Sequence, residues 1–464
     1  MGRYFIETYG CQMNLADTET MCGILDGSGW SRTSEVKAAD LIVVNTCSVR
    51  EKAAERAIGH LQSMAALKKN RPELIIAIAG CLPQHRGPDL ASRLPGVDLF
   101  IGPDNYRQLP EMLAGLTTPG SPGEHSGAGA AQGSDDGGEL EQAKELDRFY
   151  LRPNKKETYG DINPVRERNV NAWISIMRGC DRLCTYCAVP LARGRERSLA
   201  AKDVIAAAET AVVDGFSAIT LLGQAVTSYQ DEGRDFTWLI DRLSRPSELR
   251  RLWFLSPHPA DFNEEMLTLI GERPVFTRHL HLPLQAGSNE VLDRMRRGYT
   301  REEYLELVEM ARRLIPDVAI TTDIIVGFPG ESAADFRATV SLMEAVRFDS
   351  AFMFAYSPRE RTYSARFLED DVPHEEKMAR LREVIDLQEK HSWASYRALI
   401  GSTTEVLVKG PAKGEGERYF GRCRSNRATH FSVPEGKEPS PGDLVPVLVT
   451  DVTSHTLSGE MKIE

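Results

Sequence analysis

The feature that most constrains this chain is a run of three cysteines inside residues 177–187. Cys180, Cys184 and Cys187 have the spacing C-x3-C-x2-C. Thiolates are soft ligands that favour iron–sulfur clusters and zinc. A structural zinc site takes four protein ligands, usually from two paired C-x2-C units, whereas this run provides three. Three thiolates on a four-iron cluster leave one iron open for a small molecule. A zinc knuckle and unrelated core cysteines are the alternatives.

Length and charge set further bounds. The chain has 464 residues, 41% of them hydrophobic, which predicts about three domains with ordinary cores. Its formal net charge is −11, so any surface for nucleic acid must be local. No apolar run reaches membrane-span length and the N-terminus does not read as a signal peptide, so we expect a cytoplasmic protein without a membrane segment. In that reducing compartment, eight cysteines favour metal ligands over disulfides.

The first 116 residues alternate strand and helix patterns, which indicates an open parallel α/β sheet. A cysteine follows each of the first three predicted strands: Cys11 after 3–9, Cys47 after 41–45 and Cys81 after 74–79. Ligands of open α/β sheets bind at the carboxyl ends of strands, so we expect these three side chains to meet at one edge as a second cluster site. The alternative is that each is simply buried. Cys22, inside a predicted helix, is interpreted as a core residue.

Residues 117–147 differ in composition. They are rich in Gly, Ser, Pro and Ala, lack aromatic residues, and carry seven acidic residues against one Lys. Such a segment buries too little apolar surface to order itself, so we predict a flexible acidic linker without a catalytic role.

The strand–helix alternation resumes over residues 166–397. Six strands are predicted, at 173–177, 219–222, 252–255, 279–282, 319–326 and 350–354. Six such units predict an open (β/α)6 partial barrel, whose chemistry lies on the loops after the strands. Gly223, Gln224, Ser256 and Gln285 occupy these loops and are interpreted as cofactor-binding; an ordinary tight turn is the alternative for the glycine.

The tail, residues 400–464, follows a long predicted helix and reads as five short strands. That pattern predicts a small β-barrel. Its segment 418–427 is basic with interleaved aromatics, which suits RNA: Arg binds phosphates and aromatic rings stack on bases. The alternative is a solvated strand with core Tyr and Phe. Cys423 is interpreted as structural.

Several motifs of the chain resemble those of a known family. The clearest are Thr8-Tyr9-Gly10-Cys11-Gln12-Met13-Asn14, Asn45-Thr46-Cys47-Ser48-Val49-Arg50-Glu51-Lys52-Ala53, Ala79-Gly80-Cys81, His281-Leu282-Pro283-Leu284-Gln285-Ala286-Gly287-Ser288 and Asp323-Ile324-Ile325-Val326-Gly327-Phe328-Pro329-Gly330-Glu331. Outside the linker, the chain resembles the radical S-adenosylmethionine (SAM) methylthiotransferases. The resemblance implies a cluster domain (1–116), a radical SAM barrel (166–397) and a TRAM β-barrel that binds RNA (400–464). Within the family it is similar to the branch acting on isopentenyladenosine in tRNA; the branch acting on threonylcarbamoyladenosine is the alternative.

The resemblance also implies a division of labour. Cys180, Cys184 and Cys187 would hold a 4Fe-4S cluster whose open iron binds SAM, with Tyr186 as the usual aromatic between ligands. One-electron cleavage of SAM would give a 5′-deoxyadenosyl radical that takes hydrogen from C2 of N(6)-isopentenyladenosine at tRNA position 37. Cys11, Cys47 and Cys81 would hold an auxiliary 4Fe-4S cluster that presents the sulfur, methylated by a second SAM. No protein acid–base pair can take that hydrogen, so the cofactor must carry the radical.

Partners follow from the same resemblance. We expect the tRNA anticodon stem-loop as substrate, an electron donor such as flavodoxin or ferredoxin, and a monomer. Two arginine-rich segments, 193–197 and 294–297, are interpreted as phosphate-binding, with ordinary surface charge as the alternative. Ala225 and Ala355 depart from the family pattern, which normally has Asn and Lys there. A catalytically inactive iron–sulfur or zinc RNA-binding protein therefore stays open as an alternative.

Overall fold

The computed structural model describes residues 2–48, 51–117, 148–167, 170–412 and 418–463. The predicted linker therefore lies outside the described residues, apart from Thr117. The chain divides into two compact units. Unit 1 comprises Met1–Glu167, Arg178–Cys180 and Ala188–Arg197, and unit 2 comprises Arg168–Met177, Asp181–Cys187 and Ser198–Glu464.

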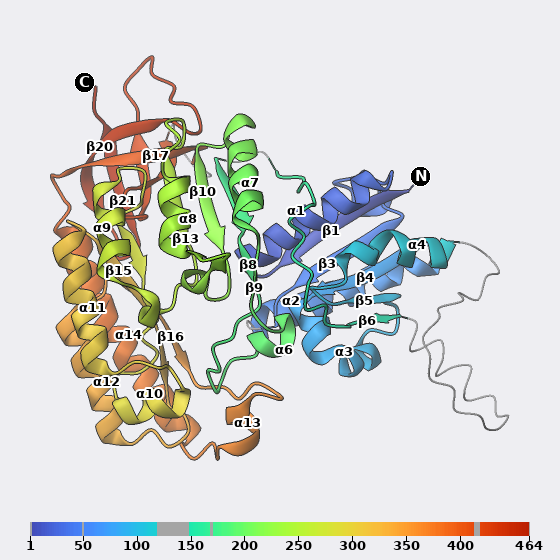
Figure 1. Cartoon of the computed structure of the whole chain (residues 1–464), viewed down its shortest axis with the longest axis horizontal. Helices are drawn as coiled ribbons and strands as arrows, with labels where there is room; N and C mark the ends of the chain where they lie inside the picture. Colours follow the sequence, from blue (N-terminus) through green and yellow to red (C-terminus); the bar gives the residue numbers. More distant parts are fainter. Residues whose placement is uncertain (1, 49–50, 118–147, 168–169, 413–417, 464) are drawn as a thin grey trace. The chain divides into compact units, whose positions relative to one another are not determined.

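Unit 1 is built on a six-stranded sheet in the order β2-β1-β3-β4-β5-β6, with every pair parallel (Figure 1). Its strands are β1 (Arg3–Tyr9), β2 (Ser31–Arg32), β3 (Leu41–Thr46), β4 (Ile75–Gly80), β5 (Leu99–Ile101) and β6 (Phe149–Tyr150). Its helices are α1 (Gln12–Gly27), η1 (Val36–Ala38), α2 (Glu51–Ala65), η2 (Ala66–Lys69), α3 (Cys81–Arg93), η3 (Tyr106–Gln108), α4 (Leu109–Thr117) and α6 (Val189–Arg193).

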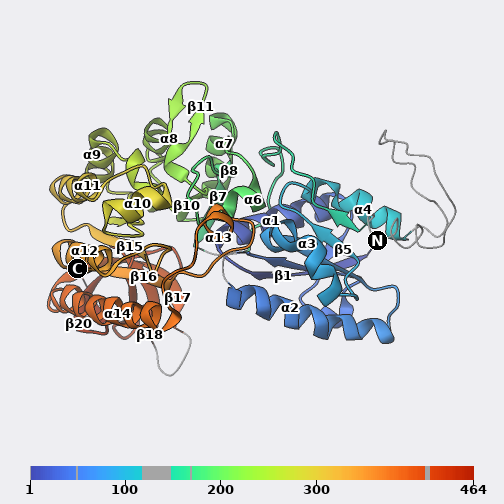
Figure 2. The same cartoon turned by 90° about the horizontal axis from the view of Figure 1, so that it is seen from below.

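Helices cover both faces of this sheet. Strands β3 and β4 are buried at every position, which is why they read as continuous apolar runs. Helices α1 and α4 pack on one face, where Cys22 lies in the core as predicted, and α2 and α3 pack on the other. Figure 2 shows α2 running along its face of the sheet. The two-residue edge strands β2 and β6 were not predicted, because two residues carry no periodicity.

Unit 2 contains two three-stranded parallel sheets, β13-β10-β7 and β14-β15-β16. A single parallel bridge between Leu252 and Phe276 extends the first sheet. The strands here are β7 (Asn171–Ser175), β10 (Ala218–Leu222), β11 (Gln230–Asp231), β12 (Arg234–Asp235), β13 (Arg251–Phe254), β14 (His279–His281), β15 (Ala319–Val326) and β16 (Ser350–Ala355). The two-residue strands β8 (Met177–Arg178) and β9 (Arg197–Ser198) each have one residue in either unit. The six main strands match the six predicted ones to within two residues at each end, so the predicted α/β barrel class is confirmed.

Helices alternate with these strands and share one apolar core with them. They are α7 (Ala201–Val213), η4 (Val226–Ser228), α8 (Phe236–Leu243), η5 (Pro259–Asp261), α9 (Glu264–Glu272), α10 (Asn289–Met295), α11 (Arg301–Leu314), α12 (Ala333–Val346), α13 (Tyr363–Phe367) and α14 (His374–Arg397).

The tail of unit 2 forms a closed five-stranded barrel in the order β17-β18-β19-β21-β20, drawn in red in Figure 1. Its strands are β17 (Thr403–Pro411), β18 (Arg418–Cys423), β19 (Ala428–Ser432), β20 (Leu444–Val452) and β21 (Thr456–Met461). The predicted small β-barrel is confirmed, and Cys423 lies in its core. Among the described helices, none is both long and apolar enough to span a membrane.

Candidate functional site

Cys11, Cys47 and Cys81 stand at the carboxyl ends of three neighbouring strands. The register sets Tyr9 of β1 beside Thr46 of β3, and Thr46 beside Gly80 of β4. The Cys47 amide also donates to the Tyr9 carbonyl at 3.0 Å. Because each cysteine follows one of these paired strand ends, the structure brings all three to the same edge of the sheet.

The sulfurs influence one another. A side-chain hydrogen bond from Cys47 is the main reason why the pKa of Cys11 falls to about 5. Burial raises the pKa of the Cys81 thiol, against the positive charge of Arg193. Cys11 caps helix α1 and Cys81 begins α3, and a helix N-terminus favours a thiolate.

Local sequence fixes this edge. Gly80 has φ of +99°, and a Cβ atom there would lie 2.4 Å from the side-chain oxygen of Asn45. Asn45 is fully buried and donates to the Asn14 carbonyl at 2.8 Å, while Asn14 accepts from the Cys11 amide at 3.3 Å. The motif residues around the cysteines therefore hold the strand ends and the start of α1 together.

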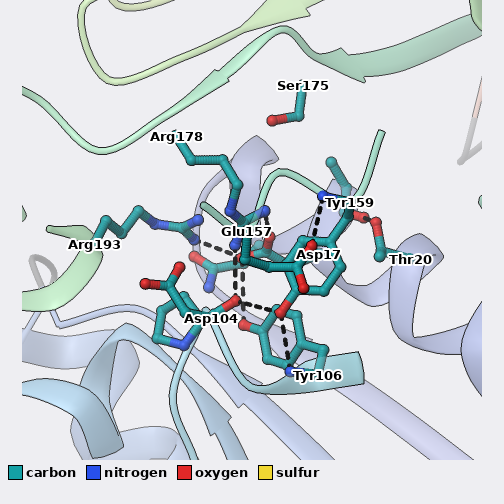
Figure 3. Close-up of polar contacts among 12 residues, drawn as sticks. Asp17, Thr20, Asp104, Tyr106, Glu157, Tyr159, Ser175, Arg178 and Arg193 are labelled. Carbon is teal, nitrogen blue, oxygen red and sulfur yellow. Dashed lines mark hydrogen bonds and ion pairs between the residues drawn. The ribbon is translucent and has the colours of Figure 1, made fainter. Parts of the chain in front are cut away.

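A buried ion cluster surrounds Asp17 (Figure 3), and its Arg193 contacts Cys81. Asp17 of α1 is 1% exposed and accepts from Arg193 Nη2 at 2.6 Å and from Arg178 Nη1 at 2.9 Å. Arg193 Nε points to Cys81 Sγ at 3.2 Å. Burial alone would raise the pKa of the Asp17 carboxyl, but the charges of Arg193 and Arg178 outweigh it and hold the pKa below its usual range.

This cluster corrects one sequence interpretation. Arg193 is 4% exposed, and the Arg197 side chain is buried against Asp104 at 2.8 Å. Neither guanidinium is accessible to a tRNA phosphate, so the phosphate-binding interpretation of segment 193–197 is wrong for both. A run of arginines reads as surface charge in a sequence because its buried acidic partners lie far away in the chain.

The second cysteine set lies around the loop that follows β8. Cys180 is buried in unit 1, where its amide donates to the Gly194 carbonyl at 3.2 Å. In unit 2, the Cys187 amide donates to the Cys184 carbonyl at 3.1 Å. Arg297 Nη1 points to Cys184 Sγ at 3.2 Å and to the Tyr186 hydroxyl at 3.5 Å.

Arg297 has an unusual environment for a charge. It is 6% exposed, and its other partners are the Tyr299 hydroxyl and the Pro283 carbonyl. Within the described part of the chain, no carboxylate forms an ion pair with it. The phosphate-binding interpretation of segment 294–297 is therefore wrong for Arg297, because this guanidinium faces a cysteine and not solvent.

These contacts test whether the residues fit anionic clusters. Within the described ranges, no three His, Cys, Asp or Glu side chains form a group that could hold a single metal ion, so the case rests on the surroundings of the sulfurs. A buried guanidinium is costly unless an opposite charge compensates it. Arg297 faces Cys184 without a carboxylate, and Arg193 Nη1 is a buried donor that has no hydrogen-bond partner among the described residues. Both sets of surroundings fit a negatively charged ligand group.

The predicted cofactor-binding residues of the barrel follow its strands as expected. Gly223 follows β10, and a Cβ atom there would lie 2.6 Å from Met177 Cγ. The side-chain oxygen of Gln224 is buried and has no partner within the described residues. Ser256 is exposed with φ of +59°, and its carbonyl accepts from the Val226 amide at 3.0 Å, which joins the loops after β10 and β13.

Two further residues of this predicted set lie beside β15. Gln285 is buried with φ of +70°, and its backbone bonds to Asp323 and Ile325 at 2.8 and 2.9 Å. The Tyr186 ring lies 6.3 Å, edge to face, from Phe328, the second residue after β15. Both therefore belong to the carboxyl-end loops. The departures from the family pattern fall there too: Ala225 is buried at the start of η4, and Ala355 ends β16.

Sequence reasoning missed an aromatic face on β16. Its Phe352 and Phe354 are 61% and 53% exposed. They pair in register with Asp323 and Ile325 of β15, so the four side chains share one face of the sheet. His281 of β14 joins them: its ring centre lies 6.2 Å from that of Phe352, and its Nε2 lies 3.3 Å from Asp323 Oδ2. The sequence signal that could have revealed this face was the pair of aromatic residues at positions i and i+2 of a predicted strand.

The polar part of this face is a row of hydrogen-bonding groups in which the donors depend on the histidine tautomers. Burial lowers the pKa of His279 to about 3, so its ring is neutral and carries one N–H. Thr321 Oγ1 lies 2.9 Å from His279 Nε2 and 3.0 Å from His281 Nδ1. If His279 donates to Thr321, then Thr321 donates to His281 Nδ1, and His281 Nε2–H donates to Asp323. One oxygen of Asp323 then keeps its capacity to accept a hydrogen bond.

In the basic segment 418–427 of the tail barrel, some side chains pack against the protein and others face solvent. Tyr419 stacks on the core residue Phe431 with ring centres 6.0 Å apart, which favours the core alternative for this ring. Arg424 Nη2 donates to the Pro274 carbonyl at 3.3 Å. Arg418 is exposed, and Phe420 is half-buried beside His430. Only part of the predicted RNA-binding segment therefore faces solvent.

Comparison with known proteins agrees with this architecture. Residues 3–102 match "Uncharacterized protein family UPF0004", residues 174–343 match the radical SAM superfamily, and residues 397–462 match the TRAM domain. In fold, the chain is similar to a radical S-adenosylmethionine methyltransferase, TsrM, from Kitasatospora setae, solved with tryptophan and a SAM analogue. That likeness has a TM-score of 0.54 at 14% identity and covers 76% of this chain and 72% of that one, so it supports the fold alone.

Sequence relatives are much more similar. A tRNA-2-methylthio-N(6)-dimethylallyladenosine synthase from Pelodictyon phaeoclathratiforme is 42% identical over 458 residues, 98% of both chains. The enzyme of the same name from Prosthecochloris aestuarii is 40% identical over 456 residues, 98% of this chain and 97% of that one. With cysteine sets, domain order and full-length identity in agreement, the chain belongs to the radical SAM methylthiotransferases, in the family of the tRNA-2-methylthio-N(6)-dimethylallyladenosine synthases.

Proposed function

We propose that this chain adds a methylthio group to C2 of N(6)-isopentenyladenosine at position 37 of tRNA. Relatives covering nearly the whole chain are named for this reaction. The structural observation that carries the proposal is the pair of cysteine sets, each with a sulfur that receives a buried arginine N–H. We propose domains at 1–116, 166–397 and 400–464, a cytoplasmic location, and a monomer reduced by flavodoxin or ferredoxin.

In this proposal each cysteine set holds one 4Fe-4S cluster. Cys180, Cys184 and Cys187 hold the cluster that binds SAM, and Cys11, Cys47 and Cys81 hold the auxiliary cluster that presents sulfur. When bound, the clusters and SAM supply the radical hydrogen removal and the sulfur that no protein acid or base can provide at an aromatic C–H. Gly223, Gln224, Ser256, Gln285 and Tyr186 contact SAM at the carboxyl-end loops. The unpartnered oxygen of Gln224 is suited to accept from an ammonium group.

The chain's own residues hold the target base in place. We assign this role to the face of Phe352 and Phe354, because exposed aromatic rings stack on bases irrespective of base identity. Asp323 supplies selectivity: its remaining acceptor can take the single N6–H that isopentenyladenosine retains. The chain from Thr321 through His281 fixes the carboxylate orientation for that bond. The exposed Arg418 and the half-buried Phe420 of the tail barrel bind the tRNA further from the reacting carbon.

The test separates the two cysteine sets. Replacing Cys11, Cys47 and Cys81 with Ala should leave SAM cleavage, measured as 5′-deoxyadenosine after dithionite reduction, while methylthiolated nucleoside disappears from the treated tRNA. Replacing Cys180, Cys184 and Cys187 should abolish both. Circular dichroism must show that the variants fold, since loss of a cluster can unfold a domain. Methylthiolated tRNA from a folded Cys11/Cys47/Cys81 variant would refute the sulfur-presenting role.

The inactive RNA-binding alternative gives a different result. A protein that has lost catalysis would bind tRNA and release no 5′-deoxyadenosine, even fully loaded with iron and SAM. Mass spectrometry of tRNA nucleosides separates the remaining alternative, because a threonylcarbamoyladenosine enzyme would methylthiolate that nucleoside and leave isopentenyladenosine unchanged.

A further inference from the structure

The two cysteine sets share a feature that their ligand spacing does not require. Arg193 Nε lies 3.2 Å from Cys81 Sγ, and Arg297 Nη1 lies 3.2 Å from Cys184 Sγ. Both arginines are almost fully buried. They come from different units and from separate arginine-rich segments, yet each gives one sulfur of one set a guanidinium N–H.

We propose that Arg193 and Arg297 are positioning residues that raise the reduction potentials of the auxiliary and the SAM-binding cluster, respectively. The inference rests on the proposed function, since it requires that both sets hold clusters. Cluster potentials depend on net charge and on hydrogen bonds to the sulfurs. Reduction adds a negative charge, so a nearby positive charge and an N–H···S bond stabilise the reduced form and raise the potential. Such outer partners also fix the orientation of the ligand they contact.

A purely structural role does not account for the charge balance. Beside Cys81, the Asp17 carboxylate pairs with both Arg178 and Arg193, and Arg178 also interacts with the charges of Asp104 and Glu157. Arg193 shares the Asp17 carboxylate, and its buried Nη1 has no hydrogen-bond partner among the described residues. Arg297 has no carboxylate among its described partners at all. If these arginines served packing alone, the buried charge of Arg297 would stay uncompensated, and a buried N–H of Arg193 would stay without an acceptor. An anionic cluster supplies the missing charge.

The two sites differ in a way that predicts an order of effects. Asp17 offsets part of the charge of Arg193, whereas the neutral partners of Arg297 offset none of it. Loss of Arg297 should therefore lower the potential of its cluster more than loss of Arg193 lowers the potential of the auxiliary one.

The test for Arg193 uses the full-length chain with Cys180, Cys184 and Cys187 replaced by Ala, so that only the auxiliary cluster is present. Arg193→Lys and Arg193→Gln are added, and the midpoint potential is measured by redox titration followed by electron paramagnetic resonance. We expect the potential to fall in the order parent, Lys, Gln. Arg178→Gln removes an equal charge from the same ion cluster without touching a sulfur, and should shift the potential less. An equal shift in Arg178→Gln would overturn the direct N–H···S role.

The test for Arg297 uses the chain with Cys11, Cys47 and Cys81 replaced by Ala. Arg297→Lys and Arg297→Gln should lower the potential of the SAM-binding cluster, again in that order. Arg296→Gln is the matched control, because Arg296 is adjacent and exposed, and stacks over Tyr363 with its guanidinium 4.3 Å from the ring centre. The potential of the SAM-binding cluster in the Arg296→Gln variant should equal the potential in the parent.

The outcomes separate this inference from the proposed function. Iron content and the resonance spectrum are recorded first, and a parent chain that assembles no cluster overturns both ideas. Clusters that form with unchanged potentials in the Lys and Gln variants overturn only the role of the arginines. Where a Gln variant keeps no cluster, the Lys variant decides: a potential below that of the parent supports the inference, and a potential equal to the parent overturns it.

Discussion

Arg427, which lies between β18 and β19, forms an ion pair with Asp349, the residue that precedes β16. The same carboxylate accepts from the Ser395 hydroxyl and, through its other oxygen, from the Ile320 amide at 2.7 Å. The tail barrel is therefore tied to the larger α/β part of unit 2 by one of the arginines that its sequence offers to RNA. Binding of RNA by this barrel must rely on other side chains.

Arg418→Ala and Phe420→Ala should therefore weaken tRNA binding, while Arg427→Ala should mainly lower thermal stability. Loss of one phosphate contact should reduce the slope of the logarithm of the tRNA binding constant against the logarithm of the salt concentration by about 1. Filter binding across a series of salt concentrations measures this slope. A tRNA affinity unchanged in both Arg418→Ala and Phe420→Ala would remove the barrel face from the proposed interface.

Phe352→Ala and Phe354→Ala should each lower kcat/KM for tRNA. Base–aromatic stacking contributes about 1–3 kcal/mol per base, which corresponds to a loss of about 5- to 150-fold. SAM cleavage without tRNA should stay unchanged, since the proposed function places these rings against the base and gives them no role at the cysteines. Phe367→Ala is the control, because Phe367 is equally exposed but lies on α13. An equal loss in Phe367→Ala would point to a general surface effect instead of a base site.

Anaerobically reconstituted protein should contain about eight irons per chain, from two four-iron clusters. Replacement of either cysteine set with Ala should leave about four, because the sets belong to separate loops and bind independently. Replacement of Cys22 and Cys423, which lie in apolar cores, should leave all eight. Chemical iron determination gives the count, and an unchanged count in either triple variant contradicts the assignment of two sets.

Glu19 should make the free energy of unfolding of unit 1 depend on pH. Burial raises the pKa of its carboxyl to about 7. A carboxyl whose pKa is higher in the folded state than in the unfolded chain stabilises the fold fully below the unfolded pKa, and that contribution is lost as pH rises through the folded pKa. Stability should therefore fall between about pH 4.5 and 7, by at most about 3 kcal/mol.

Glu19→Gln should remove this dependence and stabilise the protein at pH 8. Urea denaturation at several pH values measures the difference. Glu55→Gln serves as the control of opposite sign, because the hydrogen bond from exposed Arg93 lowers the pKa of Glu55. A parallel pH profile in the parent and in Glu19→Gln would show that the carboxyl titrates normally in the folded state.

The strands and the cysteine edge were predictable because their information is local. The apolar runs at β3 and β4 predict strands buried on both faces, and parallel pairing then brings Cys11, Cys47 and Cys81 together. The charge environment was not predictable: the buried partner of Arg193 is Asp17, 176 residues away. The hydrogen-bonded face of His281 and Asp323 likewise joins positions 42 residues apart, and neither residue type signals that pairing by itself.

The distance along the chain between Asp17 and its partners has a consequence for biosynthesis. Its two guanidinium partners follow it by 161 and 176 residues, so both are absent when the ribosome has completed only the first 116 residues. Until they emerge, compaction of the nascent sheet would leave a carboxylate buried without a counter-charge. Assembly of unit 1 must therefore wait until translation has passed residue 193. An isolated 1–116 fragment should be unstable when expressed alone, and iron loading at Cys81 should follow the synthesis of residue 193.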